Sequence, residues 1–191
     1  MEEMTHIMND TETTGVDPAI AGIIQLSAIK FNPITMQTGA AFDMCCTLLP
    51  RRRWDDSTRK FWMQDNREVY KTIIERARPP REVFQAYADF CAKDAPFGGY
   101  TFVAKPLKFD WPMIESHMID LDIVFPFAHH NCLDMHSWIA GLRGVGKRTT
   151  IEDEVPFPAN GKKHNALHDC AWQIDCMFHA KRGHIPATLV A

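Results

Sequence analysis

The sequence lacks the marks of several broad classes of protein. None of its cysteines forms a C-x-x-C pair, and the chain has neither a signal peptide nor an apolar run of about 18 residues. We therefore expect reduced thiols, a cytoplasmic protein and no contact with a membrane. The six cysteines are Cys45, Cys46, Cys91, Cys132, Cys170 and Cys176.

The chain also lacks a strong net charge, an internal repeat and any low-complexity segment. Its 21 Lys and Arg residues against 24 Asp and Glu residues give a net charge of −3. The molecule as a whole therefore does not attract nucleic acid, and any such binding needs a local patch. With 191 residues and 46% hydrophobic content, the chain can bury one core, and we expect residues 1–191 to form a single domain.

The hydrophobic pattern predicts strands first and helices later. Short apolar runs predict neighbouring strands at 5–10, 22–31 and 40–48, and 97–102 predicts a fourth strand. The polar stretch 144–163 has no period and is long enough for a functional loop. This order argues for a mixed α/β sheet. Capping residues and helical spacing predict helices at 55–77, from 79 onward, and at 109–118, 134–142 and 165–182.

Two carboxylates near the start of the chain carry the strongest functional signal. The segment MNDTETTG (8–15) reads as the end of a buried strand, and side chains two apart on a strand share a face, so Asp10 and Glu12 lie side by side. Adjacent like charges destabilise a fold unless a cation lies between them. Carboxylate oxygens suit Mg²⁺ or Mn²⁺. The alternative is an ordinary acidic strand end that runs into a Thr-Thr-Gly turn.

Three further residues complete an ordered set. Asp110 follows the fourth predicted strand in KFDWP, and Asp169 lies near the start of the last helix in HNALHDCA, with His164 five residues before it. His164 lies beside the long loop, from which it could swing over a site held by Asp169. Singly, an Asp before Trp-Pro is usually a cap, and a lone His is usually an ordinary surface or core residue. Together with D-x-E, these residues form the set that a two-metal phosphodiesterase needs.

These motifs give the chain a resemblance to a known family. DTETTG at 10–15, KFDWPM at 108–113 and HNALHD at 164–169 resemble the motifs of the DEDDh branch of the 3′–5′ exonucleases. Within that branch, 57–71 and LHDCA at 167–171 resemble phage-type exonucleases and the related bacterial ribonucleases that trim RNA 3′ ends. The resemblance implies the α/β ribonuclease H-like fold, a mixed sheet of about five strands flanked by helices.

The resemblance also implies an activity and a site. It implies release of nucleoside 5′-monophosphates from the 3′ end of single-stranded DNA or RNA by two-metal hydrolysis. The implied cofactors are two Mg²⁺ or Mn²⁺ ions, and for a phage-encoded chain the implied location is the host cytoplasm. The implied metal ligands are Asp10, Glu12, Asp110 and Asp169, which count as catalytic together with the general base His164.

Substrate contacts are predicted less sharply. Basic and aromatic residues between Arg51 and Trp62 suit phosphate contact and base stacking, and Lys105 and Lys108 could contact phosphate. The alternative is a solvated charge run followed by a helix that packs its aromatic rings inward. The expected substrate-binding residues are Thr11, Thr13, Thr14, Trp62, Lys105 and Phe109.

Two positions depart from the family pattern. Asn9 stands where a buried apolar residue is usual, and a buried amide destabilises a fold unless it has partners. Pro106 stands four positions before Asp110, where many relatives have an Asn, so the hydrogen bond of that Asn is absent or replaced. Neither position is an implied metal ligand, so neither excludes activity.

Other sites and functions are alternatives. GLRGVGKR at 141–148 nearly matches a phosphate-binding loop, but Arg148 replaces the hydroxyl that would hold Mg²⁺ and the segment follows a helix. His129, His130 and His136 lack the spacing of zinc ligands. A proofreading-type subunit of a polymerase complex, or a catalytically weak nucleic-acid-binding relative, stays open. The oligomeric state and the choice between DNA and RNA also stay open.

Overall fold

The computed structural model describes residues 3–146 and 151–183, in which five strands form one sheet in the order β3-β2-β1-β4-β5. The pairs β1–β2 and β2–β3 are antiparallel, and the pairs β1–β4 and β4–β5 are parallel, so the sheet is mixed as predicted. The strands are β1 (His6–Thr13), β2 (Ile23–Asn32), β3 (Gln37–Cys45), β4 (Thr101–Ala104) and β5 (Cys132–Asp134).

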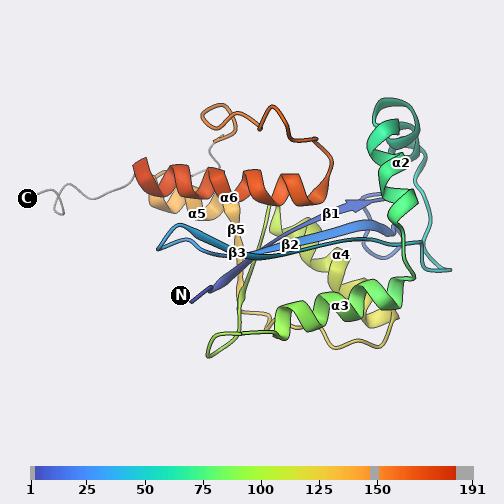
Figure 1. Cartoon of the computed structure of the whole chain (residues 1–191), viewed down its shortest axis with the longest axis horizontal. Helices are drawn as coiled ribbons and strands as arrows, with labels where there is room; N and C mark the ends of the chain where they lie inside the picture. Colours follow the sequence, from blue (N-terminus) through green and yellow to red (C-terminus); the bar gives the residue numbers. More distant parts are fainter. Residues whose placement is uncertain (1–2, 147–150, 184–191) are drawn as a thin grey trace, which may run out of the picture.

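Helices cover both faces of this sheet. They are α1 (Asp56–Lys60), the π-helix η1 (Phe61–Asp65), α2 (Arg67–Arg76), α3 (Pro80–Ala92), α4 (Leu107–Asp120), α5 (Met135–Leu142) and α6 (Ala166–Gly183). Figure 1 shows α5 and α6 on one face, α3 and α4 on the other, and α2 beside one end of the sheet. Among the described residues, no helix combines the length and apolar character that a membrane span requires.

The central strand β1 divides its side chains between the two helical layers. Ile7 belongs to the core cluster that includes residues of α3 and α4, whereas Met8 belongs to the cluster formed with α5 and α6. Because successive side chains on a strand alternate between faces, Asp10 and Glu12 face the α6 layer and Thr11 faces the α4 layer. One strand therefore presents polar groups to both layers at the same end of the sheet.

The C-terminal ends of β1 and β4 lie at one edge of the sheet. The two strands are parallel, with Ile7 opposite Phe102 and Met8 opposite Val103. The helix α4 begins shortly after β4, and α6 packs on β1 and β2. This edge consequently gathers residues from β1, α4 and α6, which are far apart in the sequence.

The predicted strands and helices are present, but several of them begin or end at other residues than predicted. The first strand continues beyond Asp10 to Thr13, so it carries Glu12 as well. The fourth strand is shorter than predicted, because Gly98 and Gly99 adopt positive φ angles of 86° and 83° in the preceding turn. The three-residue strand β5 was not predicted, since a strand of that length leaves no periodic pattern.

The single helix predicted over 55–77 is wrong in detail. The segment forms α1, η1 and α2, because Asn66 leaves the helical conformation with φ −127° and ψ 32°. The Asn66 backbone N–H donates to the Phe61 carbonyl at 3.0 Å, five residues back, as in a π-helix. The break changes which aromatic side chains of this segment point inward.

The structure accounts for both departures from the family pattern: Asn9 has hydrogen-bond partners, and another side chain accepts from the backbone that follows Pro106. The Asn9 side chain is fully buried, and its Nδ2 donates to the carbonyls of Ile7 at 2.8 Å and Val103 at 3.3 Å. The Tyr87 hydroxyl donates to Asn9 Oδ1 at 2.6 Å. At the other position, Pro106 precedes α4, where Asp134 accepts from the first backbone N–H of the helix at 3.1 Å.

Tyr87→Phe tests the buried Asn9 network. The substitution removes the donor to Asn9 Oδ1 and leaves a buried acceptor unpaired, which costs about 1–3 kcal/mol of the free energy of unfolding. Urea denaturation measures the loss. In Tyr70→Phe, which removes a hydroxyl that makes no hydrogen bond among the described residues, the change stays within about 0.5 kcal/mol. Equal stability of Tyr87→Phe and the wild type would contradict the network.

Candidate active site

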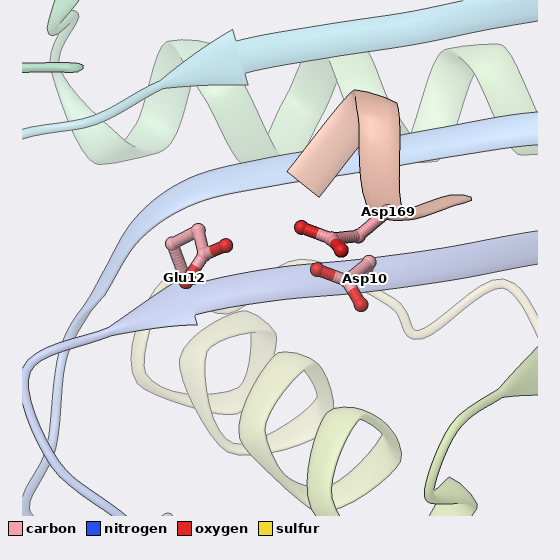
Figure 2. A group of neighbouring side chains, drawn as sticks. All are labelled: Asp10, Glu12 and Asp169. Carbon is pink, nitrogen blue, oxygen red and sulfur yellow. The ribbon is translucent and has the colours of Figure 1, made fainter. Parts of the chain in front are cut away.

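Three carboxylates converge at the C-terminal end of β1. Asp10 and Glu12 lie on β1, and Asp169 lies in the first turn of α6. Each offers an oxygen, and these oxygens all lie within 4.8 Å of one another. Figure 2 shows the three groups pointing into one space between the strand and the helix. The structure thus brings together residues separated by more than three quarters of the chain.

The start of α6 fixes the position of Asp169. The Asn165 side chain accepts from the His168 backbone N–H at 3.3 Å, and the Asp169 N–H donates to the Asn165 carbonyl at 3.0 Å. The Asn165 side chain therefore satisfies a backbone donor that a helix start leaves without a partner, and the Asn165 backbone carbonyl accepts the first bond of the helix. The first turn holds Asp169 over β1.

Gln173 is a site residue that the sequence did not reveal. It lies one helical turn after Asp169 and is 3% exposed, and its Nε2 donates to Asp10 Oδ1 at 2.7 Å. The Gln173 Oε1 atom has no hydrogen-bond partner among the described residues. The spacing of four residues from Asp169 is a signal that could have placed Gln173 on the same face of α6.

Asp110 approaches the site from the opposite helical layer. It lies in the first turn of α4, is 2% exposed, and accepts at Oδ1 from the Thr11 N–H at 3.0 Å and from the Thr11 hydroxyl at 2.7 Å. It is not part of the three-carboxylate cluster, but it lines the same cavity of about 220 Å³. That cavity is lined by Asp10, Thr11, Glu12, Lys105, Phe109, Asp110, His164, Asp169, Trp172 and Gln173.

Burial raises the pKa of every carboxyl in this cavity, and repulsion from neighbouring carboxylates raises the pKa of Asp10 and Glu12 further. Burial, followed by the charges of its neighbours, raises the pKa of Asp10 and of Glu12 well above their usual range. Burial raises the pKa of Asp110 to about 7 and that of Asp169 to about 6. A group of buried oxygen donors that repel one another fits Mg²⁺ or Mn²⁺, which would offset the repulsion.

His164 lines the carboxylate cavity from the end of the long loop. It precedes α6 by two residues, and its backbone φ is 61°. Its ring meets the Phe61 ring at a centroid distance of 4.8 Å and an interplanar angle of 89°. Burial, and to a lesser degree the charge of Lys163, lowers the pKa of His164. A neutral imidazole at pH 7 can accept a proton.

The neighbouring His168 has a different role. Its Nδ1 accepts from the Lys162 backbone N–H at 2.8 Å, and it does not line the carboxylate cavity. The ring of His168 therefore holds the loop at Lys162, whereas His164 lines the carboxylate cavity.

The described part of the long loop is attached to the sheet and to α5 and α6. Glu152 pairs with Lys105 and with His136, both at 3.0 Å. The Trp172 indole N–H donates to the Val155 carbonyl at 2.8 Å. These contacts hold the segment before His164 close to the site, which limits the predicted swing of that residue. Residues 147–150, with Arg148 of the near-match to a phosphate loop, lie outside the described part.

A second cavity adjoins the first. It has a volume of about 350 Å³ and shares Thr11, Glu12 and Phe109 with the carboxylate cavity. Its size suits part of a single nucleotide, and aromatic rings in its wall suit a nucleobase. The remaining lining residues are Thr13, Gly15, Val16, Ser57, Thr58, Phe61 and Trp62.

Two expected substrate contacts are buried in this structure. Trp62 is 1% exposed, and its indole N–H donates to the Thr13 carbonyl at 2.9 Å, whereas the neighbouring Phe61, which lines the same cavity, is half-buried and presents the more accessible ring. Thr14 is fully buried, and its hydroxyl donates to the Arg53 carbonyl at 2.6 Å. Its side chain lines neither cavity.

The other expected contacts lie where a substrate could reach them. Lys105 lines the carboxylate cavity, and its Nζ lies 4.5 Å from the centroid of the Trp172 ring. Thr11, Thr13 and Phe109 line the second cavity. In the basic segment, Arg52 is buried and pairs with Asp120 at 2.7 Å, so it is a structural residue.

A larger groove of about 1110 Å³ lies between α4 and α5 and contains Lys108, His129 and His136. None of the residues in its lining belongs to the carboxylate cluster. Size alone therefore does not identify the site, and the convergent carboxylates do.

A comparison with protein families identifies the chain. The model of the 3′-5′ exoribonuclease Rv2179c-like domain matches residues 5–180. The chain belongs to this exoribonuclease family. No curated protein matches this sequence.

Solved structures share the fold of this chain at low sequence identity. The nuclease domain of 3′hExo, a DEDDh family member bound to rAMP, has a TM-score of 0.70 and 13% identity over 93% of this chain and 91% of that chain. S. pombe Pop2p, in its Mg²⁺- and Mn²⁺-bound form, has a TM-score of 0.65 and 11% identity over 93% and 83%.

E. coli ExoI, in a zinc-bound complex with single-stranded DNA, has a TM-score of 0.69 and 14% identity. The match covers 99% of this chain but 42% of the ExoI chain, so this chain spans less than half the length of that relative. The comparisons confirm the predicted ribonuclease H-like fold and the DEDDh resemblance, and they support a 3′–5′ exonuclease.

The raised carboxyl pKa values predict that stability without metal falls as the pH rises. Between about pH 4 and pH 7, the folded chain retains protons on Asp110 and Asp169 that the unfolded chain, with an ordinary Asp pKa of 3.8, has lost. Unfolding therefore releases protons, and higher pH favours it. From pH 5 to pH 7.5 in chelator, the midpoint of thermal unfolding should fall more, or rise less, in the wild type than in Asp10→Asn; the buried His6 and His117, whose pKa values are lowered to about 4, act in the opposite direction in both proteins.

Mn²⁺ should raise that midpoint more at pH 7.5 than at pH 5, because carboxyl ligands must lose their protons to bind it. Asp10→Asn is the control: with one charge removed, both the pH dependence and the Mn²⁺ effect should shrink. A Mn²⁺ effect of equal size in Asp10→Asn and the wild type would refute a cation site at Asp10.

Proposed function

We propose that this exonuclease removes nucleotides one at a time from the 3′ end of single-stranded RNA or DNA and releases nucleoside 5′-monophosphates. RNA is the preferred substrate in this proposal, because the family to which the chain belongs is described as exoribonuclease. The observation that carries the proposal is the convergence of four carboxylates and a histidine on a cavity next to an aromatic-lined pocket.

Asp10, Glu12, Asp110 and Asp169 are the residues that would hold divalent ions. Three of them form a cluster, and the fourth lines the same cavity. When bound, Mg²⁺ or Mn²⁺ ions supply Lewis-acid activation of water and stabilisation of the departing 3′ oxygen. Gln173 holds the Asp10 carboxylate in one orientation through its hydrogen bond at 2.7 Å.

His164 acts as the general base. It lines the carboxylate cavity, and burial keeps its imidazole neutral, so a ring nitrogen can accept the proton of the attacking water. Lys105 lines the same cavity and offers an ammonium group to a phosphate oxygen. Its ion pair with Glu152 and its position over the Trp172 ring keep this ammonium group in place.

The second cavity holds the terminal nucleoside. Phe61 and Phe109 offer rings to the base, and Glu12 lies at the boundary between the two cavities. A pocket of about 350 Å³ admits one nucleoside at most. Cleavage therefore releases mononucleotides. A paired end must first unstack, at a cost of a few kcal/mol, so single strands are cut faster than duplexes.

Degradation of 5′-labelled oligonucleotides tests this function. With Mg²⁺ or Mn²⁺, a single strand should shorten from its 3′ end in steps of one nucleotide, and RNA should shorten faster than DNA of the same sequence. Chelator should abolish the ladder, and Ca²⁺ should not support fast turnover, because its larger size and irregular coordination misalign the attack. A single internal fragment would indicate an endonuclease and refute the proposal.

Substitutions separate the roles within the site. Asp10→Ala or Asp169→Ala should abolish cleavage, since each removes a charge that holds an ion. His164→Ala should keep Mn²⁺ binding and lose roughly 10²–10⁴-fold in kcat, the usual contribution of a general base. His168→Ala is the matched control, with a small effect on kcat. The reverse result for the two histidines would overturn the assignment of the base.

A further inference from the structure

Phe61 contacts both the nucleoside pocket and the proposed base. It is the first residue of η1, is half buried, and lines the second cavity. Its ring also meets the His164 ring edge to face, with 4.8 Å between centroids and 89° between planes. Edge-to-face packing at this distance is a favourable aromatic geometry. One side chain therefore joins the wall of the pocket to the imidazole.

The His164 backbone needs support from its surroundings. Its φ of 61° lies in the left-handed region, which a residue with a Cβ adopts only when tertiary contacts favour it. His164 directly precedes Asn165, whose side chain and carbonyl accept from the first turn of α6, and this cap fixes the course of the main chain there. The cap leaves rotation of the imidazole free. Among the described residues, Phe61 provides the aromatic contact that restricts this rotation.

Phe61 is itself fixed relative to the carboxylates. Its ring packs on the Trp62 ring at 5.2 Å and 80°, and the Trp62 indole N–H donates to the Thr13 carbonyl at 2.9 Å. Thr13 follows Glu12 directly on β1. A short series of contacts therefore ties the position of the Phe61 ring to the strand that carries two of the proposed metal ligands.

We propose that Phe61 is a positioning residue for the base: its ring holds the His164 imidazole toward the carboxylate cavity, and a nucleoside in the adjoining pocket strengthens that hold by packing against the ring. The proposal rests on the proposed function, in which His164 is the base. It assigns to Phe61 an effect on kcat that substrate stacking alone would not produce.

A double-mutant cycle tests the proposal on the full chain with a single-stranded RNA substrate and Mn²⁺. Phe61→Leu keeps an apolar side chain and removes the ring, and kcat should fall roughly 10- to 100-fold, as expected for a misplaced catalytic group. In the His164→Ala background, the same substitution should change kcat less than about threefold, because the two residues act together. Phe61→Tyr, which restores a ring, should recover most of kcat.

Tyr70→Leu is the matched control. Tyr70, like Phe61, packs on the hydrophobic cluster that contains Trp62, but it lines neither cavity. Its loss should therefore lower the thermal midpoint slightly and leave kcat unchanged. Mn²⁺ affinity should be equal in the wild type and in Phe61→Leu. Multiplicative effects of Phe61→Leu and His164→Ala on kcat, or a change confined to KM, would overturn the positioning role.

Proton NMR gives a second readout that does not depend on activity. In the wild type, the His164 ring protons, identified by their loss in His164→Ala, should show a nuclear Overhauser effect to the Phe61 ring and a ring-current shift that disappears in Phe61→Leu. Absence of both signals in the wild type would refute the contact, whether or not Phe61→Leu folds. An inactive wild type with both signals present would instead refute the proposed function and leave the contact established.

Discussion

The repulsion among four carboxylates, two of them buried and two half-buried, is the constraint on which the rest of this structure depends. Asp10 and Glu12 share one face of β1, and Asp169 faces them from α6. Asp110 lies in α4 and accepts a hydrogen bond from the Thr11 backbone N–H. Burial makes each charge costly, and each neighbour raises that cost. The fold tolerates the arrangement because β1 is the central strand, packed between helical layers that are held together elsewhere by extensive apolar cores.

The elements around the cluster are organised to keep it in place. Gln173 and Thr11 donate hydrogen bonds to two of the carboxylates, and Asn165 caps the helix that carries a third. The loop before His164 is held by the Glu152 pairs, so the proposed base remains near the carboxylates without a substrate present. A site built in this way needs little rearrangement to bind ions, which favours catalysis by pre-organised groups.

The sequence predicted the parts of the site that depend on local spacing. Asp10 and Glu12 follow from the two-residue period of a strand. Asp110, His164 and Asp169 were candidates from their places along the chain, and the resemblance gave them their roles. All five line one cavity. The sequence did not show that the Phe61 ring is more accessible than the Trp62 ring, which was the expected substrate contact. Neighbouring helical residues differ by about 100° in direction, and the π-helix alters which of them points inward.

Tertiary contacts decided the remaining differences. The buried Thr14 depends on a carbonyl 39 positions away, and Gln173 is recognisable as a site residue only once α6 is placed over β1. The attachment of the long loop depends on ion pairs between segments that no local pattern relates. Asn9, the clearest departure from the family pattern, is stabilised by Tyr87, which lies 78 positions away.

A calorimetric titration with Mn²⁺ tests most directly whether the converging carboxylates form a cation site. The wild type should bind up to two ions per chain in the presence of a nucleoside monophosphate, and Asp10→Asn should lose most of that affinity. Asp175→Asn, which removes an exposed carboxylate from the same helix as Asp169, should bind like the wild type. Absence of binding, or equal binding by the wild type and Asp10→Asn, would contradict the account.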